Sequence, residues 1–446
     1  MKQHKNQIVS NLKRVLKSPT TLNIITVVII TIVVKGFGFY KEVVVAGSFG
    51  LSELLDTFYI AALVPGFIYE VFINAFNTVF IPNYIAEQKD QNKTAALQGT
   101  SLMVTILASV FFMFLAYIFT DLYLETFFSG HTQNYYRLVK IQFLILLPCI
   151  PFWGLTSLIS GLLTIYDEFK YSTIYPILTS ITIIISLLFF KEILQEKVLA
   201  IGMLAGAILQ FLFLLSIALK RKIIKIGKPN IRSRNTIIML KQTPAKISAS
   251  LFNGINPFVD QYFSAQLAIG SITALNYGNK IPSFSIGVIS IALGNVLLPY
   301  FSKLTSDDFS ASILKLKSII KLLLIYSIII VVLLFIFSYP IIEILFERKE
   351  FTSNDTFIVS KVQQMYLFQI PSFITGIVMV RFLIAINRNY FMVLLSIISL
   401  IFNILLNYVL IKIMGVYGLA LATSIVSILN SIILYIYIKR VKNEFV

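Results

Sequence analysis

The segment VPGFIYEVFINAFNTVFIPNY, residues 64–84, is long and apolar enough to cross a membrane as a helix, and its pattern occurs twice. A span needs about 20 mostly apolar residues, because the hydrocarbon core is about 30 Å thick and a helix rises about 1.5 Å per residue. The segment IPSFSIGVISIALGNVLLPYF, residues 281–301, aligns with it so that both prolines coincide, Pro65 with Pro282 and Pro82 with Pro299. This repeat predicts two similar halves that run through the membrane in the same direction.

The whole chain has the composition of a membrane protein. Hydrophobic residues make up 57% of its 446 residues and charged residues 13%, against about 45–50% and about 25% in soluble domains. The pattern predicts an all-α integral membrane protein with about twelve transmembrane helices. The predicted spans are 20–47, 56–84, 97–119, 138–164, 171–190, 197–219, 238–267, 271–300, 314–338, 356–386, 390–412 and 415–438.

The net charge of +17 indicates membrane orientation and not nucleic-acid binding, because 22 Tyr and 38 Phe accompany it within apolar runs. Lys and Arg concentrate at the N-terminus and after every second span, which predicts that both termini are cytoplasmic. The first apolar run is too long for a cleavable signal peptide. The predicted parts are a cytoplasmic basic N-terminus (1–19), an N-lobe (20–219), a cytoplasmic basic linker (220–237), a C-lobe (238–438) and a cytoplasmic tail (439–446).

The basic linker is predicted to be an extended link or turn, since it contains Gly227, Pro229 and Asn230. Its cations are expected to lie against anionic headgroups, outside the transport path. They are Lys220, Arg221, Lys222, Lys225, Lys228, Arg232 and Arg234.

Catalysis is disfavoured by the short loops and the residue types. The longest predicted external loop, about 120–137, offers only Asp121, Glu125 and His131, and the chain has no P-loop. The single Cys149 excludes a disulfide framework and a cysteine zinc site. A transporter is therefore predicted, and no metal or cofactor is expected.

Ionised and amide side chains within the spans are the candidate functional residues. A Lys near the bilayer centre costs about 2.5–3.5 kcal/mol on insertion scales, so it usually faces a cavity or a partner. Polar stripes are predicted on four spans, and the stripe of the second span runs through Asp56, Glu70, Asn74 and Asn77. Helix–helix hydrogen bonding is the alternative explanation for single Asn or Ser positions. Stripes that carry both charge signs favour a hydrated central cavity. The predicted substrate-binding residues are Lys35, Lys41, Glu42, Asp56, Lys280, Asn279, Asn276, Asn77 and Asp260, with Glu70 as a candidate coupling carboxylate.

Three segments resemble the MurJ/MviN-type lipid flippases of the multidrug/oligosaccharidyl-lipid/polysaccharide exporter superfamily. They are VKGFGFYKEVVVAGSFG (34–50) with LLDTFYIAALVP (54–65), NPFVDQYFSAQLAIGSITALNYGNKIPSFSIGVISIALGNVLLPYFSK (256–303) and NYFMVLLSIISLIFNILLNYVLIKIMGVYGLALATS (389–424). The resemblance implies a V-shaped pair of six-helix lobes that alternates between inward- and outward-facing states, in the bacterial inner membrane. Lys35, Lys41 and Lys280 fall where the family places arginines, and Glu42 and Asp56 fall on its acids. The resemblance implies that these positions together hold the diphosphate of an undecaprenyl-linked saccharide.

The chain also departs from that family. Phe67 to Glu70 stand where the family has paired arginines, and its two further C-terminal spans have no counterpart. These departures make an O-antigen or other surface-polysaccharide repeat unit, as in lipopolysaccharide biosynthesis, the first expected substrate. A lipid II flippase is the alternative, and a membrane polysaccharide polymerase or ligase is a disfavoured alternative of another class.

The expected mechanism is alternating access by a monomer, driven by H⁺, Na⁺ or the membrane potential. Expected partners are the lipid-linked saccharide, membrane lipids, and the glycosyltransferases and polymerase of the same pathway, with no nucleic acid. Neutral side chains on the stripes are expected to contact the sugars, among them Gln363, Gln364, Gln369, Asn403 and Asn407.

Overall fold

The computed structural model describes residues 19–90, 94–128, 130–388 and 390–445, so the predicted basic N-terminus lies outside the described residues apart from Pro19. The described chain is helical and contains no strand, which confirms the all-α fold class. The helices, in chain order, are α2 (Pro19–Phe49), α3 (Glu53–Ile68), the π-helix η1 (Tyr69–Ile73), α4 (Asn74–Asp90), α5 (Thr94–Ile118), α6 (Thr120–Phe127), α7 (Gln133–Leu146), α8 (Cys149–Ile165), α9 (Phe169–Ile174), α10 (Ile177–Leu194), the 3₁₀ turn η2 (Gln195–Lys197), α11 (Val198–Lys220), α12 (Arg234–Ala265), α13 (Ser271–Gly278), α14 (Lys280–Asp307), α15 (Phe309–Ile336), α16 (Ser338–Phe346), α17 (Ser353–Leu367), α18 (Gln369–Ala385), α19 (Phe391–Met414) and α20 (Val416–Phe445).

These helices agree with about twelve membrane spans. Eight stretches of the described chain are long and apolar enough to cross a membrane by length and composition, and one of them, Ile177–Lys220, contains both α10 and α11. Helix α2, helix α12 and the α13–α14 pair cover the remaining predicted spans. The chain is therefore a multi-pass membrane protein.

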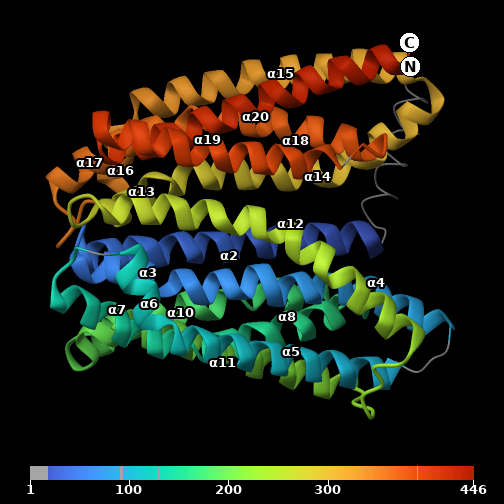
Figure 1. Cartoon of the computed structure of the whole chain (residues 1–446), viewed down its shortest axis with the longest axis horizontal. Coiled ribbons are helices and arrows are strands. Elements are labelled where there is room, and N and C mark those ends of the chain that lie inside the picture. The colour runs from blue at the N-terminus through green and yellow to red at the C-terminus, as the bar shows by residue number, and fades with distance from the viewer. Residues whose placement is uncertain (1–18, 91–93, 129, 389, 446) are drawn as a thin grey trace, which may run out of the picture. The chain divides into compact units, whose positions relative to one another are not determined.

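The first compact unit comprises Met1–Val45, Ala61–Leu124 and Thr132–Ser250. Its long helices run side by side, blue to green in Figure 1, and its core contains Phe80, Tyr84 and Leu163. Gly206 on α11 lets α10 approach, because a Cβ atom there would lie 2.6 Å from the Cα atom of Thr179.

The basic linker belongs to this unit and is extended, without regular secondary structure between residues 223 and 230. Its backbone bonds to the first turns of α5. The Gly227 N–H donates to the Ala95 carbonyl at 2.8 Å, and the Lys225 N–H donates to Gln98 Oε1 at 2.8 Å. The Asn230 N–H donates to Thr100 Oγ1 at 2.9 Å. These bonds fix the linker along α5.

The second unit comprises Ala46–Ile60, Glu125–His131 and Leu251–Val446. Helices α14, α15, α18 and α20 pack around a core that includes Phe301 and Phe382, whose rings meet edge to face at 5.4 Å. In the yellow-to-red part of Figure 1 the long helices of this unit also lie side by side. Gly50, at φ +55°, ends α2 in a left-handed turn that favours glycine.

Candidate functional site

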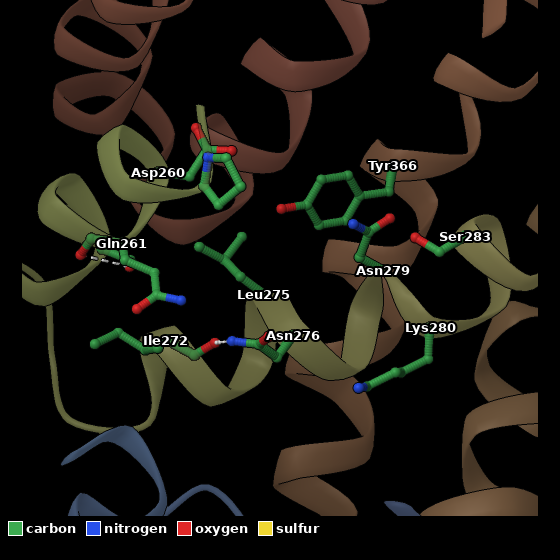
Figure 2. Close-up of a pocket in the computed structure, with 11 residues that line it drawn as sticks. Asp260, Gln261, Ile272, Leu275, Asn276, Asn279, Lys280, Ser283 and Tyr366 are labelled. Atoms are coloured by element: carbon green, nitrogen blue, oxygen red, sulfur yellow. Dashed lines mark hydrogen bonds between the residues drawn. The ribbon is translucent and has the colours of Figure 1, made fainter. Parts of the chain in front are cut away.

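A polar cavity of about 330 Å³ lies inside the second unit, between α12, α13, α14 and α17 (Figure 2). It brings together four predicted substrate-binding residues, Asp260, Asn276, Asn279 and Lys280. The other residues that line it are Pro257, Gln261, Ser264, Ile272, Leu275, Ser283 and Tyr366. One cation, one carboxylate and several amides and hydroxyls therefore share one cavity, which suits a polar ligand with several hydrogen-bonding groups.

The break between α13 and α14 creates this arrangement. Helix α13 ends at Gly278 and α14 begins at Lys280, so residues on both sides of Asn279 project into the same cavity (Figure 2). The Asn276 amide donates to the Ile272 carbonyl at 2.9 Å. The Gln369 amide, from α18, donates to Asn279 Oδ1 at 3.2 Å. These bonds orient both asparagines.

The carboxylate of Asp260 accepts hydrogen bonds from two side-chain amides of α19. Its Oδ1 atom accepts from Asn407 at 2.8 Å and from Asn403 at 3.2 Å, and Asn407 also donates to Asn403 at 3.3 Å. The two asparagines, predicted to contact sugars, thus use their amide N–H groups on Asp260. They fix the carboxylate at the wall of the cavity.

Asp56 lies outside this cavity and caps helix α13. Its buried carboxylate accepts from the Gly270 N–H at 2.7 Å, the Thr273 N–H at 2.8 Å and the Thr273 hydroxyl at 2.6 Å. The first residues of α13 have no cap from their own segment, since Gly270 at φ +91° provides no side chain. The contact with substrate predicted for Asp56 stays a prediction, while the structure gives this residue a positioning role for α13.

The predicted charged residues of α2 lie in the first unit. Lys41 Nζ forms an ion pair with Glu42 Oε1 at 2.7 Å, so the charge of Lys41 is neutralised locally. Lys35 is half-buried and forms no ion pair with any residue of the described ranges. Lys35 is therefore the α2 cation that is open to an anionic ligand.

The predicted stripe of the second span is interrupted by the π-helix η1. A π-helical turn inserts an extra residue and rotates everything that follows it, so the spacing of an uninterrupted α-helix does not hold. Glu70 is exposed and accepts from the Asn74 amide at 3.2 Å. Asn77 is instead buried, donates to the Gly154 carbonyl at 3.1 Å and accepts from Thr105 at 3.5 Å. Asn77 and Glu70 therefore face different surroundings, and Asn77 joins helices.

The segment between the predicted third and fourth spans contains Asp121 and His131, two of the groups considered for catalysis. Asp121 pairs with Lys140 at 2.6 Å. Burial lowers the pKa of the His131 imidazole, which favours its neutral form. No group of three or more His, Cys, Asp or Glu in the described ranges could hold a metal ion.

Sequence reasoning missed Gln261, Ser264 and Tyr366 as lining residues, although each is a polar group within a predicted span. Gln261 is one residue from Asp260, and Tyr366 comes from α17, far away in the chain. A polar-residue pattern marks such positions as candidates, but it does not show which of them share a cavity.

Comparison with known proteins gives a consistent result. Residues 45–445 match the family model described as "Lipid II flippase MurJ". A "Probable lipid II flippase MurJ" of Buchnera aphidicola subsp. Schizaphis graminum is 30% identical over 360 residues, covering 79% of this chain and 70% of that protein. The "Lipid II flippase MurJ" of Burkholderia cenocepacia is 26% identical over 360 residues, covering 77% and 69%.

Two solved structures share the fold. The lipid II flippase MurJ in an inward closed conformation has a TM-score of 0.80 and 27% identity, covering 93% of this chain and 87% of that chain. An inward-facing multidrug transporter of the MATE family has a TM-score of 0.75 at 14% identity, covering 92% and 96%, and shows similarity of fold alone.

Proposed function

Because the chain belongs to the MurJ family, we propose that it is a lipid II flippase, which moves this peptidoglycan precursor from the cytoplasmic to the outer leaflet of the inner membrane. The chain is a transporter and not an enzyme. The relatives support lipid II over the O-antigen unit that is expected first from the sequence. The enzymes that build and consume the saccharide are its expected pathway partners.

The observation that carries the proposal is the cavity of the second unit, where Lys280 is grouped with Asn276, Asn279 and Ser283. A diphosphate has acceptor oxygens only, and all of these side chains can donate hydrogen bonds to it. Lys acts there as a point charge, because it lacks the bidentate fork of Arg. Lys35 on α2 supplies a second cation in the proposed transport path.

The experiment is flipping of fluorescent lipid II in proteoliposomes that contain the purified protein. We expect Lys280→Ala to lower the rate at least tenfold and Lys280→Arg to retain most of it. Lys412→Ala is the matched control, because Lys412 is exposed and bonds only Tyr408 among the partners that the structure describes. Flipping of a lipid-linked O-antigen unit but not of lipid II would overturn the substrate assignment.

We propose that Glu70 couples transport to H⁺, since it is an exposed carboxylate on a π-helix within a predicted span. A Glu70→Gln protein is then expected to flip lipid II at a rate that no longer responds to an imposed pH gradient. Its response to a Na⁺ gradient or to membrane potential, measured in the same vesicles, separates the three driving forces. An unchanged pH response removes Glu70 from the coupling mechanism.

A further inference from the structure

We infer that a second cavity, inside the first unit, binds a sugar ring of the lipid-linked saccharide, an inference that rests on the proposed function. The cavity measures about 410 Å³ and lies between α3, η1, α8, α10 and α11. Its lining includes three aromatic and four polar side chains, Tyr69, Trp153, Tyr175, Thr156, Thr179, Ser180 and Gln210. No charged side chain lines it, so the ligand it suits is neutral.

The aromatic side chains form one wall of the cavity. The rings of Tyr69 and Trp153 meet edge to face, with their centroids 5.7 Å apart. Tyr69 is the first residue of the π-helix η1, a type of turn that is frequent at functional sites. A pyranose ring has an apolar C–H face that packs on aromatic rings, while its edge carries hydroxyl and amide groups.

The polar side chains provide hydrogen-bonding groups for that edge. Thr156 is 2% exposed, and its buried hydroxyl has no hydrogen-bond partner within the described part of the chain. Buried hydroxyls are nearly always paired, so this one requires an explanation. Gln210 donates to Thr179 Oγ1 at 2.6 Å, which fixes both side chains at the wall. A sugar hydroxyl in the cavity would be that partner once the Thr156 side chain turns its hydroxyl toward the cavity.

The cavity also adjoins the lysine-bearing part of α2. Ser180 lines the cavity, and a Cβ atom at Gly38 would lie 4.0 Å from its hydroxyl. Lys35 and Lys41 are each three residues from Gly38. A diphosphate at Lys35 would therefore lie on the same stretch of α2 that approaches the cavity lining at Ser180.

The chain offers a direct reporter, because Trp153 is its only tryptophan. The experiment titrates the purified protein in detergent with lipid II and, separately, with undecaprenyl diphosphate, which lacks the saccharide. We expect lipid II to change the Trp153 fluorescence saturably and the sugar-free lipid to change it less than one third as much. Equal responses to the two lipids would overturn the inference.

A variant that fills the cavity provides the second test. A Cβ atom at Gly66, which lines the cavity, would meet no atom within 4 Å, so Gly66→Leu projects into open space. We expect Gly66→Leu to weaken lipid II binding at least tenfold. Phe152→Leu is the matched control on α8, because its ring packs against Phe211 and does not line the cavity. If Gly66→Leu fails to fold, Trp153→Ala is the second variant; it removes the aromatic face, so we expect it to weaken lipid II binding at least tenfold, and undiminished binding would contradict the sugar site.

The outcomes separate this inference from the proposed function. If Gly66→Leu flips lipid II normally and lipid II does not change the Trp153 fluorescence of the unmodified protein, the sugar site is contradicted and the flippase assignment is intact. A saccharide-dependent fluorescence change without flipping of lipid II supports the sugar site and contradicts the assignment.

Discussion

Some of the predicted site residues line a cavity where substrate could bind, and others fix the helices that carry those lining residues. Asp56 illustrates the second group, since all of its observed hydrogen bonds go to the start of α13, the helix that carries Asn276. From the sequence, an acid at the start of an apolar span predicts a site, because buried carboxylates are costly unless they are used. The cap on α13 could not be predicted, because its partners lie more than 200 residues away.

We expect Asp56→Ala to destabilise the protein by about 3 kcal/mol or more, because two buried backbone N–H groups of α13 would lose their acceptor. Asp308→Ala is the matched control. Asp308 also caps a helix, α15, by accepting from the Ala311 N–H at 2.9 Å, but it does so at the exposed surface. Its loss is expected to cost only about 1 kcal/mol.

The measurement is thermal unfolding in one detergent, with hydrogen exchange at α13 as the local readout. Equal destabilisation by the two substitutions contradicts the structural role. A normal unfolding temperature together with lost transport would return Asp56 to the substrate-binding residues.

At the scale of helices, the sequence predicts well where long apolar segments begin and end, because hydrophobic runs bounded by charges are a strong signal. It does not predict the π-helix η1, since an inserted residue leaves no trace in composition. The stripe through Glu70 and Asn77 fails for this reason. The cavities of both units depend on such interruptions, η1 in one and the α13–α14 break in the other.

The contact between α5 and the basic linker provides a prediction at this scale. Gln98 is 1% exposed and donates to Tyr84 and to the Ile223 carbonyl while accepting from the Lys225 N–H. Gln98→Leu leaves those linker groups without partners, at a cost of about 1–3 kcal/mol each. We expect trypsin to cleave the variant near Lys225 at least tenfold faster.

The control is Ser216→Ala, an exposed residue that bonds only within its own helix. Cleavage of the Gln98→Leu protein at the rate of the unmodified protein would mean that these bonds do not hold the linker. Wild-type transport in the cleavable variant would support the expectation that the linker lies outside the transport path.

For the whole molecule, the sequence predicts the fold class, the repeat and the family because these depend on patterns spread over hundreds of residues. The substrate is predicted less well. The departures at Phe67 to Glu70 favour a surface polysaccharide, while similarity over most of the chain favours lipid II. Local departures change the chemistry of single contacts, whereas the match over most of the chain reflects the packing of many helices.

We expect the chain to cross the membrane twelve times, with both termini in the cytoplasm. Cys149 is the only cysteine and is buried, so introduced cysteines can be labelled against little background. Ile231→Cys, in the basic linker, is expected to react with an impermeant maleimide only after the membrane is opened. Ile193→Cys, at the end of α10, is expected to react in intact cells. Both side chains are exposed, at 54% and 75%, so packing within the protein does not cover either thiol. The orientation rests on cations that are spread over several loops. One missed span before residue 193 would place both cysteines on the opposite side and exchange the two labelling results. Labelling of Ile231→Cys from outside would therefore reject the twelve-span orientation and, with it, the cytoplasmic side on which lipid II is proposed to enter.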